Sequence, residues 1–210
     1  MIEDKVKFRT RYFSLLLEDV YQSKNISAVL RTAECMGIQN IHIIENNNRF
    51  AYNPYVTRGA DKWLTVNRYN TQSNNSYATV KHLKSQGYRI IATSPNVNGV
   101  SPENFDIEKG KFTIAFGTEW EGLSDIILNE ADEHLKIPMV GYTESLNLSV
   151  SAAIIIYTLC NRLRNSAVPW QLSQEDNEDV KLQWTRAMVP KSAILIDAYK
   201  KQNSFYNDQM

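Results

Sequence analysis

The sequence has few of the side chains that build disulfide frameworks or metal centres. Cys35 and Cys160 are its only cysteines among 210 residues, and two cysteines so far apart favour a reducing compartment over a disulfide-stapled fold. The three histidines, His42, His82 and His134, are scattered without the spacing of metal ligands. These absences predict a cytoplasmic protein without a metal site.

Long apolar runs and glycine-rich phosphate loops are also missing. No apolar segment approaches the length that spans a membrane, and the charged N-terminus has no signal-peptide core. Neither a Gly-x-Gly-x-x-Gly pattern after a strand nor a Walker motif is present, so an ordinary dinucleotide-binding crossover has no support. The net charge of zero argues mildly against a general nucleic-acid-binding protein.

Three local basic groups are nevertheless present. They consist of Lys5, Lys7, Arg9 and Arg11; of Arg49, Arg58, Lys62 and Arg68 in an aromatic-rich stretch; and of Lys181, Arg186, Lys191, Lys200 and Lys201. Each group alone is more often a solvated surface than an RNA site. Only folding or dimerisation could gather the three groups on one side of the protein.

The order of apolar segments predicts one α/β domain with appendages. A hydrophobic content of 43% and a charged content of 22% are ordinary for a globular protein of this length. Helices are predicted over residues 26–36, 75–86, 121–131, 149–164 and 174–202, the last interrupted by Pro190, and strands over residues 41–44, 65–69, 89–93, 111–116 and 134–137. Residues 46–62 are predicted to form a loop with a short helix. This alternation predicts a mostly parallel sheet with helices on both faces.

The most informative segment spans residues 144–156. Polar and apolar residues alternate from Ser145 to Ser151, and the pattern then changes into a helix-length apolar run. Ser149 or Ser151 is predicted to cap that helix. On this pattern alone, a strand end followed by a core helix is favoured, and a loop that holds a ligand is the alternative.

Three segments together resemble a known family. In order along the chain, they resemble the three motifs of the SPOUT methyltransferases, and most closely those of the TrmH branch. The segments are residues 25–33, residues 116–124, and residues 137–139 together with 144–149. The resemblance implies S-adenosylmethionine as cofactor, a deep trefoil knot and 2′-O-methylation of tRNA, with a D-loop guanosine as the expected target. Ribosomal RNA, the tRNA wobble nucleotide and a non-catalytic RNA-binding protein of the same fold stay open as alternatives.

The resemblance also divides the chain and implies its assembly. It predicts a basic N-terminal extension with a helix at residues 1–24, the methyltransferase domain at residues 25–165 with the knot at about 90–165, and a C-terminal helical extension at residues 166–210. The helix at 149–164 is apolar over more than one face, and large exposed apolar patches usually mark interfaces. With the dimers of the family, this pattern predicts a homodimer.

The motifs assign catalytic parts to Arg31, Asn25, Glu119, Ser145 and Asn147. Structural alternatives exist for all five: a surface ion pair of Arg31 with Glu34, a helix cap by Asn25, a surface carboxylate at Glu119, and turn capping by Ser145 and Asn147. A ribose 2′-hydroxyl is a poor nucleophile until its proton is removed. Because arginine stays protonated, Arg31 is predicted to bind a phosphate and orient the hydroxyl, while the phosphate or a neighbour accepts the proton.

The implied cofactor pocket is formed mostly by backbone at Thr93, Gly117, Ile137 and Leu146. Ile137 and Leu146 would supply apolar walls for an adenine, and Gly117 would let the chain approach the ligand closely. Residues 93–96 read Thr-Ser-Pro-Asn, whereas close relatives in the family usually have threonine-histidine-leucine. The resemblance therefore assigns no contacts to the methionine part of the cofactor.

Overall fold

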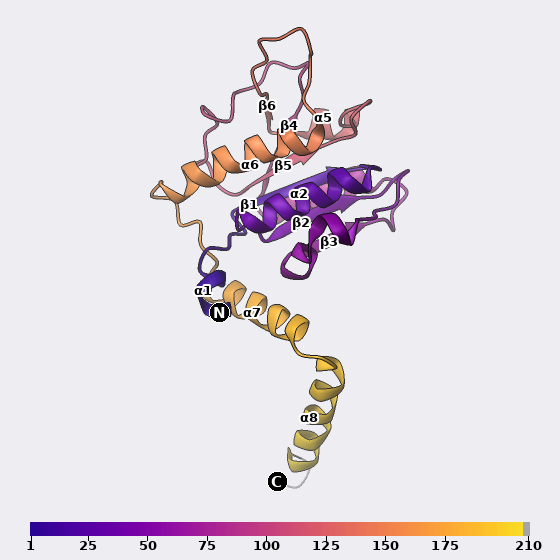
Figure 1. Cartoon of the computed structure of the whole chain (residues 1–210), viewed down its shortest axis with the longest axis vertical. Coiled ribbons are helices and arrows are strands. Elements are labelled where there is room, and N and C mark those ends of the chain that lie inside the picture. The colour runs from indigo at the N-terminus through magenta and orange to yellow at the C-terminus, as the bar shows by residue number, and fades with distance from the viewer. Residues whose placement is uncertain (208–210) are drawn as a thin grey trace.

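A six-stranded parallel sheet forms the centre of the molecule (Figure 1). The structure is a computed structural model that describes the backbone of residues 1–207 and the side chains of residues 1–199. The strands are β1 (Phe13–Glu18), β2 (Asn40–Ile44), β3 (Thr65–Tyr69), β4 (Arg89–Thr93), β5 (Phe112–Phe116) and β6 (Glu133–Leu135). They lie in the order β3-β2-β1-β5-β4-β6, and each neighbouring pair is parallel. The predicted α/β fold class is confirmed.

Helices cover both faces of this sheet. On one face lie α2 (Ser23–Cys35) and α6 (Leu148–Arg164), and on the other lie α4 (Asn75–Ser85) and α5 (Asp125–Glu130). Leu15 and Leu17 of β1 belong to the apolar layer under α2 and α6, whereas Leu16 belongs to the layer under α4 and α5. Side chains of a strand alternate between faces, so a strand that is buried on both sides is continuously apolar.

The sequence did not predict β1, although this strand lies in the middle of the sheet. All six of its residues are buried, and it falls within the predicted N-terminal extension at residues 1–24, whose helix is α1 (Ile2–Val6). A short apolar run fits a buried strand and a buried helix equally well in its periodicity, which explains the omission. The sheet therefore begins before residue 25, and the three-part division of the chain stays a prediction.

The other predicted elements are confirmed within a few residues. The predicted loop at 46–62 contains α3 (Pro54–Thr57) and η1 (Ala60–Trp63), and the predicted helical region 174–202 forms α7 (Gln174–Met188) and α8 (Ser192–Asn207), which are separated at Pro190. Gly37 follows α2 with a φ of +79°, the left-handed conformation that ends helices. None of the helices in the described part of the chain is long and apolar enough to cross a membrane.

Two arginines of the N-terminal basic group are structural, so they belong neither to a solvated surface nor to an RNA-binding one. The side chain of Arg9 is 97% buried. Its guanidinium donates hydrogen bonds to Gln39 Oε1 at 2.8 Å and to the carbonyl oxygens of Glu34 and Trp63, both at 2.9 Å. Burial lowers the pKa of Arg9 to about 10. Arg11 pairs with Asp176 and Asp179 of α7. Deleting residues 1–10 would therefore disrupt packing, and would not simply remove phosphate contacts.

His42 makes the stability of the protein depend on pH. This residue belongs to β2 and its side chain is buried. Its Nδ1 atom is 2.9 Å from the hydroxyl of Tyr69, and its Nε2 atom has no hydrogen-bond partner among the described residues. Burial lowers its pKa from the ordinary 6.5 to about 4, with a smaller contribution from His82. Between these two pH values the unfolded chain binds a proton that the folded chain does not, so stability falls as the pH is lowered.

We expect the free energy of unfolding to fall by roughly 3 kcal/mol between pH 6.5 and pH 4 through this one group. Denaturant titrations across this range measure the effect. His42→Gln should remove most of this slope, whereas the matched variant His134→Gln should keep it. Equal slopes in the wild type and His42→Gln would show that His42 is not the titrating group.

Candidate active site

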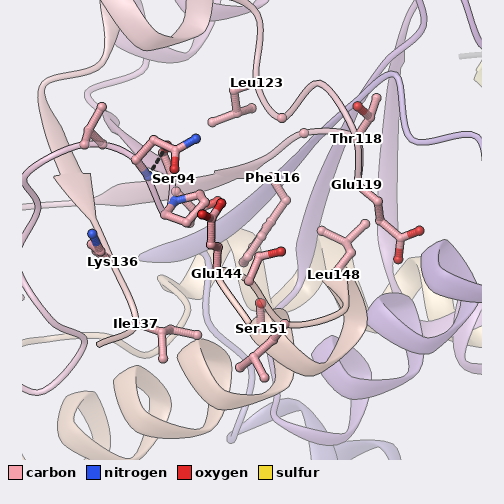
Figure 2. Close-up of a pocket in the computed structure, with 18 of the residues that line it drawn as sticks. Ser94, Phe116, Thr118, Glu119, Leu123, Lys136, Ile137, Glu144, Leu148 and Ser151 are labelled. Carbon is pink, nitrogen blue, oxygen red and sulfur yellow. Dashed lines mark hydrogen bonds between the residues drawn. The ribbon is translucent and has the colours of Figure 1, made fainter. Parts of the chain in front are cut away.

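A cavity of about 330 Å³ opens at the carboxyl ends of β4, β5 and β6, next to the start of α6. In parallel α/β sheets this edge is where ligands bind. Four chain segments that follow these strands or precede α6 line the cavity, and they include all four residues predicted for the cofactor: Thr93, Gly117, Ile137 and Leu146. Figure 2 shows Ser151 on α6, Ile137 beside this helix and Glu119 on the side of α2.

Gly117 is required by the shape of the loop that follows β5, a reason that the sequence did not indicate. The Thr118 N–H donates to the carbonyl oxygen of Gly122 at 2.9 Å, and the Gly122 N–H donates back to Thr118 at 3.1 Å. A Cβ atom on Gly117 would lie 2.0 Å from the same Gly122 oxygen. The close approach at Gly117 is therefore made by the chain's own loop, and this tight loop presents the next residue but one, Glu119.

The pocket walls combine apolar side chains with backbone groups. Phe116, Leu123 and Leu148 are buried beside the cavity, and Ile137 and Leu146 are half-buried. The hydroxyl of Thr93 donates to the carbonyl oxygen of Ala115 at 2.8 Å, so its proton is already hydrogen-bonded within the sheet. Thr93 therefore has mainly its backbone to offer a ligand.

Glu119 is the centre of a hydrogen-bonded cluster at the mouth of this cavity. Its Oε1 atom accepts from Asn25 Nδ2 and from Asn147 Nδ2, both at 2.7 Å, and its Oε2 atom accepts from Gln22 Nε2 at 2.6 Å. Asn147 Nδ2 also lies 3.3 Å from Asn25 Oδ1. Three residues predicted from separate motifs are thus in direct contact, although they are as many as 122 residues apart.

Asn147, rather than Ser149 or Ser151, is the N-cap of α6. Its Oδ1 atom accepts from the Ser149 N–H at 2.9 Å and from the Ser149 hydroxyl at 2.7 Å. The side-chain oxygen of an N-cap satisfies N–H groups of the first helical turn. Because the nitrogen of the same amide binds Glu119, Asn147 both caps the helix and belongs to the cluster.

Asn25 is not a helix cap, which corrects the structural alternative for this residue. Helix α2 begins at Ser23 with Gln22 in the N-cap position, so Asn25 lies inside the first turn. Its side chain is 93% buried and turns toward Glu119. The helix thereby carries an uncharged amide into the cluster.

Arg31 is exposed on the outer side of α2 and lies outside this cluster. Within the described part of the chain, its guanidinium makes no hydrogen bond or ion pair. Glu34, its predicted surface partner, instead lies 3.6 Å from the guanidinium of Arg9. Arg31 follows Asn25 by six residues, which corresponds to about 9 Å along the helix axis and about 120° around it.

The remaining predicted residue, Ser145, lines the cavity and is exposed. Gln22 was missed by the sequence-based prediction. The available signal was its spacing, since residues three apart at the start of a helix face the same side. Among the described residues, no group of three or more histidine, cysteine, aspartate or glutamate side chains is placed to hold a metal ion.

The fold and the position of the pocket define a class of enzyme. The model of the SpoU rRNA Methylase family matches residues 12–157, and the chain therefore belongs to this family of RNA methyltransferases. Within it, the chain is 41% identical to the tRNA (guanosine(18)-2′-O)-methyltransferase of Borreliella burgdorferi over 188 residues, which cover 90% of this chain and 84% of that protein.

Two solved structures share the fold. The A. aeolicus TrmH/SpoU tRNA modifying enzyme superposes with a TM-score of 0.78 at 22% identity, over 90% of this chain and 95% of that chain. The SpoU methyltransferase AviRb from Streptomyces viridochromogenes, solved in complex with the cofactor AdoMet, superposes with a TM-score of 0.63 at 23% identity, over 79% of this chain and 62% of that chain.

Proposed function

We propose that this protein methylates the ribose 2′-hydroxyl of a D-loop guanosine in tRNA, with S-adenosylmethionine as the methyl donor. The observation that carries the proposal is the contact of Glu119 with Asn25 and Asn147 at the mouth of the pocket. The similarity to an enzyme named for guanosine 18 supports the choice of substrate. We also propose a cytoplasmic location, because Cys35 and Cys160 are both free thiols.

The residues of the pocket fit S-adenosylmethionine. A cavity of about 330 Å³ is within the range of small-molecule sites. Ile137 and Leu146 would lie against the adenine, and backbone groups around Thr93 and Gly117 would hydrogen-bond the polar parts of the molecule. When bound, the cofactor supplies a methyl group that a positively charged sulfur activates for transfer.

The residues around the pocket mouth would bind and orient the RNA. Arg31 has a free guanidinium that can hold a phosphate through two hydrogen bonds. Ser145 can contact the ribose without adding charge. Glu119 accepts three hydrogen bonds, and a carboxylate has about four acceptor positions, which leaves one on Oε2 for a ribose hydroxyl. The proton of the reacting hydroxyl would pass to the phosphate or to this carboxylate.

A homodimer accounts for the position of Arg31. Val150, Ile154 and Tyr157 form an exposed apolar stripe on α6, with exposed fractions of 45%, 37% and 63%, and α6 packs beside α2. Burial of this stripe against a second copy would place α2 near the interface. Because Arg31 points away from the Glu119 cluster of its own chain, we propose that each site uses the partner subunit's Arg31.

Several basic residues that are free to contact RNA lie on or beside α2. Many of the others have acidic partners among the described residues: Arg11, Arg68, Lys84, Arg89, Lys109 and Lys181. Arg58 and Lys62 are exposed and carry no such partner in the described part of the chain. Arg58 directly follows α3 and Lys62 lies in η1, and both of these elements pack on α2. Tyr55 of α3 is 91% exposed, which suits stacking on an unpaired base.

We expect Arg58→Gln and Lys62→Gln each to weaken tRNA binding and to reduce its salt dependence by roughly one unit of slope per lost phosphate contact. Binding measured between low and moderate salt reads this out. Lys109→Gln removes the same charge from a residue paired with Glu133 and should leave the slope unchanged. If Arg58→Gln and Lys62→Gln changed tRNA affinity and salt slope no more than Lys109→Gln does, RNA would not contact the surface beside α2.

The function is tested by methyl transfer to defined RNAs. Purified protein and S-adenosylmethionine are incubated with an unmodified tRNA transcript, and the methylated nucleotide is mapped. We expect 2′-O-methylguanosine in the D loop, no product when that guanosine is a 2′-deoxynucleotide, and full activity with EDTA. Ribosomal RNA and a tRNA with only the wobble site intact are the competing substrates, since the family description names rRNA. Methylation of either in place of the D loop would overturn the proposed target.

A further inference from the structure

Gln22 completes the hydrogen bonding of the Glu119 cluster. It stands at the N-cap position of α2, is half-buried, and makes no capping bond with its own side chain. Its Nε2 atom donates to Glu119 Oε2 at 2.6 Å, and its Oε1 atom accepts from Asn25 Nδ2 at 2.8 Å. One side chain thus holds both the carboxylate and the buried amide of the cluster.

These contacts fix the orientation of Asn25. The two N–H groups of its amide point to Gln22 Oε1 and Glu119 Oε1, while its own oxygen faces Asn147 Nδ2. If this amide were flipped, its oxygen would face two other acceptors and its nitrogen would face a donor. Because an amide has two distinct ends, the carbonyl of Gln22 adds to the carboxylate in selecting the observed orientation.

Gln22 also determines which part of Glu119 faces outward. The Oε1 atom is saturated by two amide donors, and Gln22 occupies one of the two acceptor positions of Oε2. All three donors are uncharged, so the carboxylate is held in place with its negative charge uncompensated by a cation within the cluster. A single lone-pair direction is left for a group outside the cluster.

We propose that Gln22 is a positioning residue of the methyl-transfer site, which orients Glu119 and Asn25 so that the remaining acceptor of Glu119 meets the ribose of the target nucleotide. The inference rests on the proposed function, because it assigns the free acceptor to an RNA hydroxyl. Gln22 itself does not line the cofactor cavity. Its loss should therefore change the turnover with RNA and spare the binding of S-adenosylmethionine.

The test compares Gln22→Leu and Gln22→Glu with the wild type. Gln22→Leu removes both hydrogen bonds at similar size, and we expect kcat to fall about tenfold, with the cofactor Kd changed by less than twofold. Gln22→Glu places a second carboxylate against Glu119, and two carboxylates at this distance share a proton with a raised pKa. The protonated form can donate as Gln22 does, so the ratio of the variant's kcat to that of the wild type should fall as the pH rises.

A control and a second readout separate this inference from the proposed function. Gln86→Leu changes an exposed glutamine at the end of α4 and should have no effect. NMR titration of the carboxyl carbons in Gln22→Glu should show a carboxyl pair that titrates above an ordinary glutamate, whether or not RNA is methylated. An inactive wild type would reject the proposed function, whereas an active wild type with Gln22→Leu unchanged, or with a flat pH ratio in Gln22→Glu, would overturn the role of Gln22.

Discussion

Replacing Arg31 with alanine is expected to reduce methyl transfer at least about a hundredfold, the usual effect of removing a group that orients or assists proton transfer. The residue is exposed, and within the described part of the chain no ion pair or hydrogen bond ties it to the fold. Stability and cofactor affinity should therefore stay unchanged. Single-turnover rates with tRNA, combined with calorimetric titration of S-adenosylmethionine, measure the two effects separately.

Mixed dimers test whether Arg31 acts across the interface. Subunits with Arg31→Ala are combined with subunits that carry Glu119→Ala, each inactive by itself. If a site takes Glu119 from one chain and the partner subunit's Arg31, half of the dimers are mixed and each contains one intact site, so about one quarter of the wild-type activity should return. If both residues act within one chain, mixing restores nothing. Lys24→Ala, another exposed change on α2, serves as the control for Arg31→Ala.

Gly117→Ala is expected to damage the cofactor pocket severely. The added methyl group would lie 2.0 Å from the carbonyl oxygen of Gly122, so the loop of residues 118–122 has to open. We expect the variant to lose roughly 1–3 kcal/mol of stability, as overpacked sites do. Cofactor affinity should fall at least about tenfold, equivalent to 1.4 kcal/mol, because both the pocket wall and Glu119 move. Thermal unfolding and calorimetric titration measure these effects.

Gly141→Ala is the matched control for this prediction. It adds the same methyl group in the pocket-side segment before α6, but the nearest atom, the Thr143 nitrogen, is 4.0 Å away. Its φ lies outside the left-handed region, so alanine fits without strain. Unchanged cofactor binding in Gly117→Ala would mean that the loop relaxes at no cost to the pocket.

Motifs and periodicity predicted the sheet, the order of most elements and the pocket residues, since these depend on patterns that are local in the sequence. They failed where a residue's environment is set by distant contacts. Residues 15–17 of β1 are all leucine, because helices cover both sides of the sheet, and this run lacks the alternation that identifies a strand. Arg9 was assigned to a basic surface by its neighbours in sequence, whereas packing encloses it.

The candidate site shows the same division. The resemblance to the family motifs predicted Asn25, Glu119 and Asn147. Their pairing depends on how α2, the loop after β5 and the start of α6 are placed together, which no local pattern contains. Gln22 was not predicted, because its place in the cluster depends on the contact of its amide with Glu119, 97 residues away in the sequence. The cap at Asn147 was missed because two serines follow it, and residue type alone does not distinguish three neighbouring candidates.

The double use of Asn147 restricts what evolution can place there. Asparagine, aspartate, serine and threonine are all good helix caps, and at an ordinary N-cap they are exchanged with little consequence. At this position aspartate would place a second negative charge against Glu119. A serine or threonine has one hydroxyl, which would have to accept the hydrogen bonds that cap α6 and also donate its single proton to Glu119. Helix α6 needs an acceptor at residue 147 and Glu119 needs a donor there, and asparagine provides both. Substitutions that would preserve the stability of the helix are therefore not tolerated at this position.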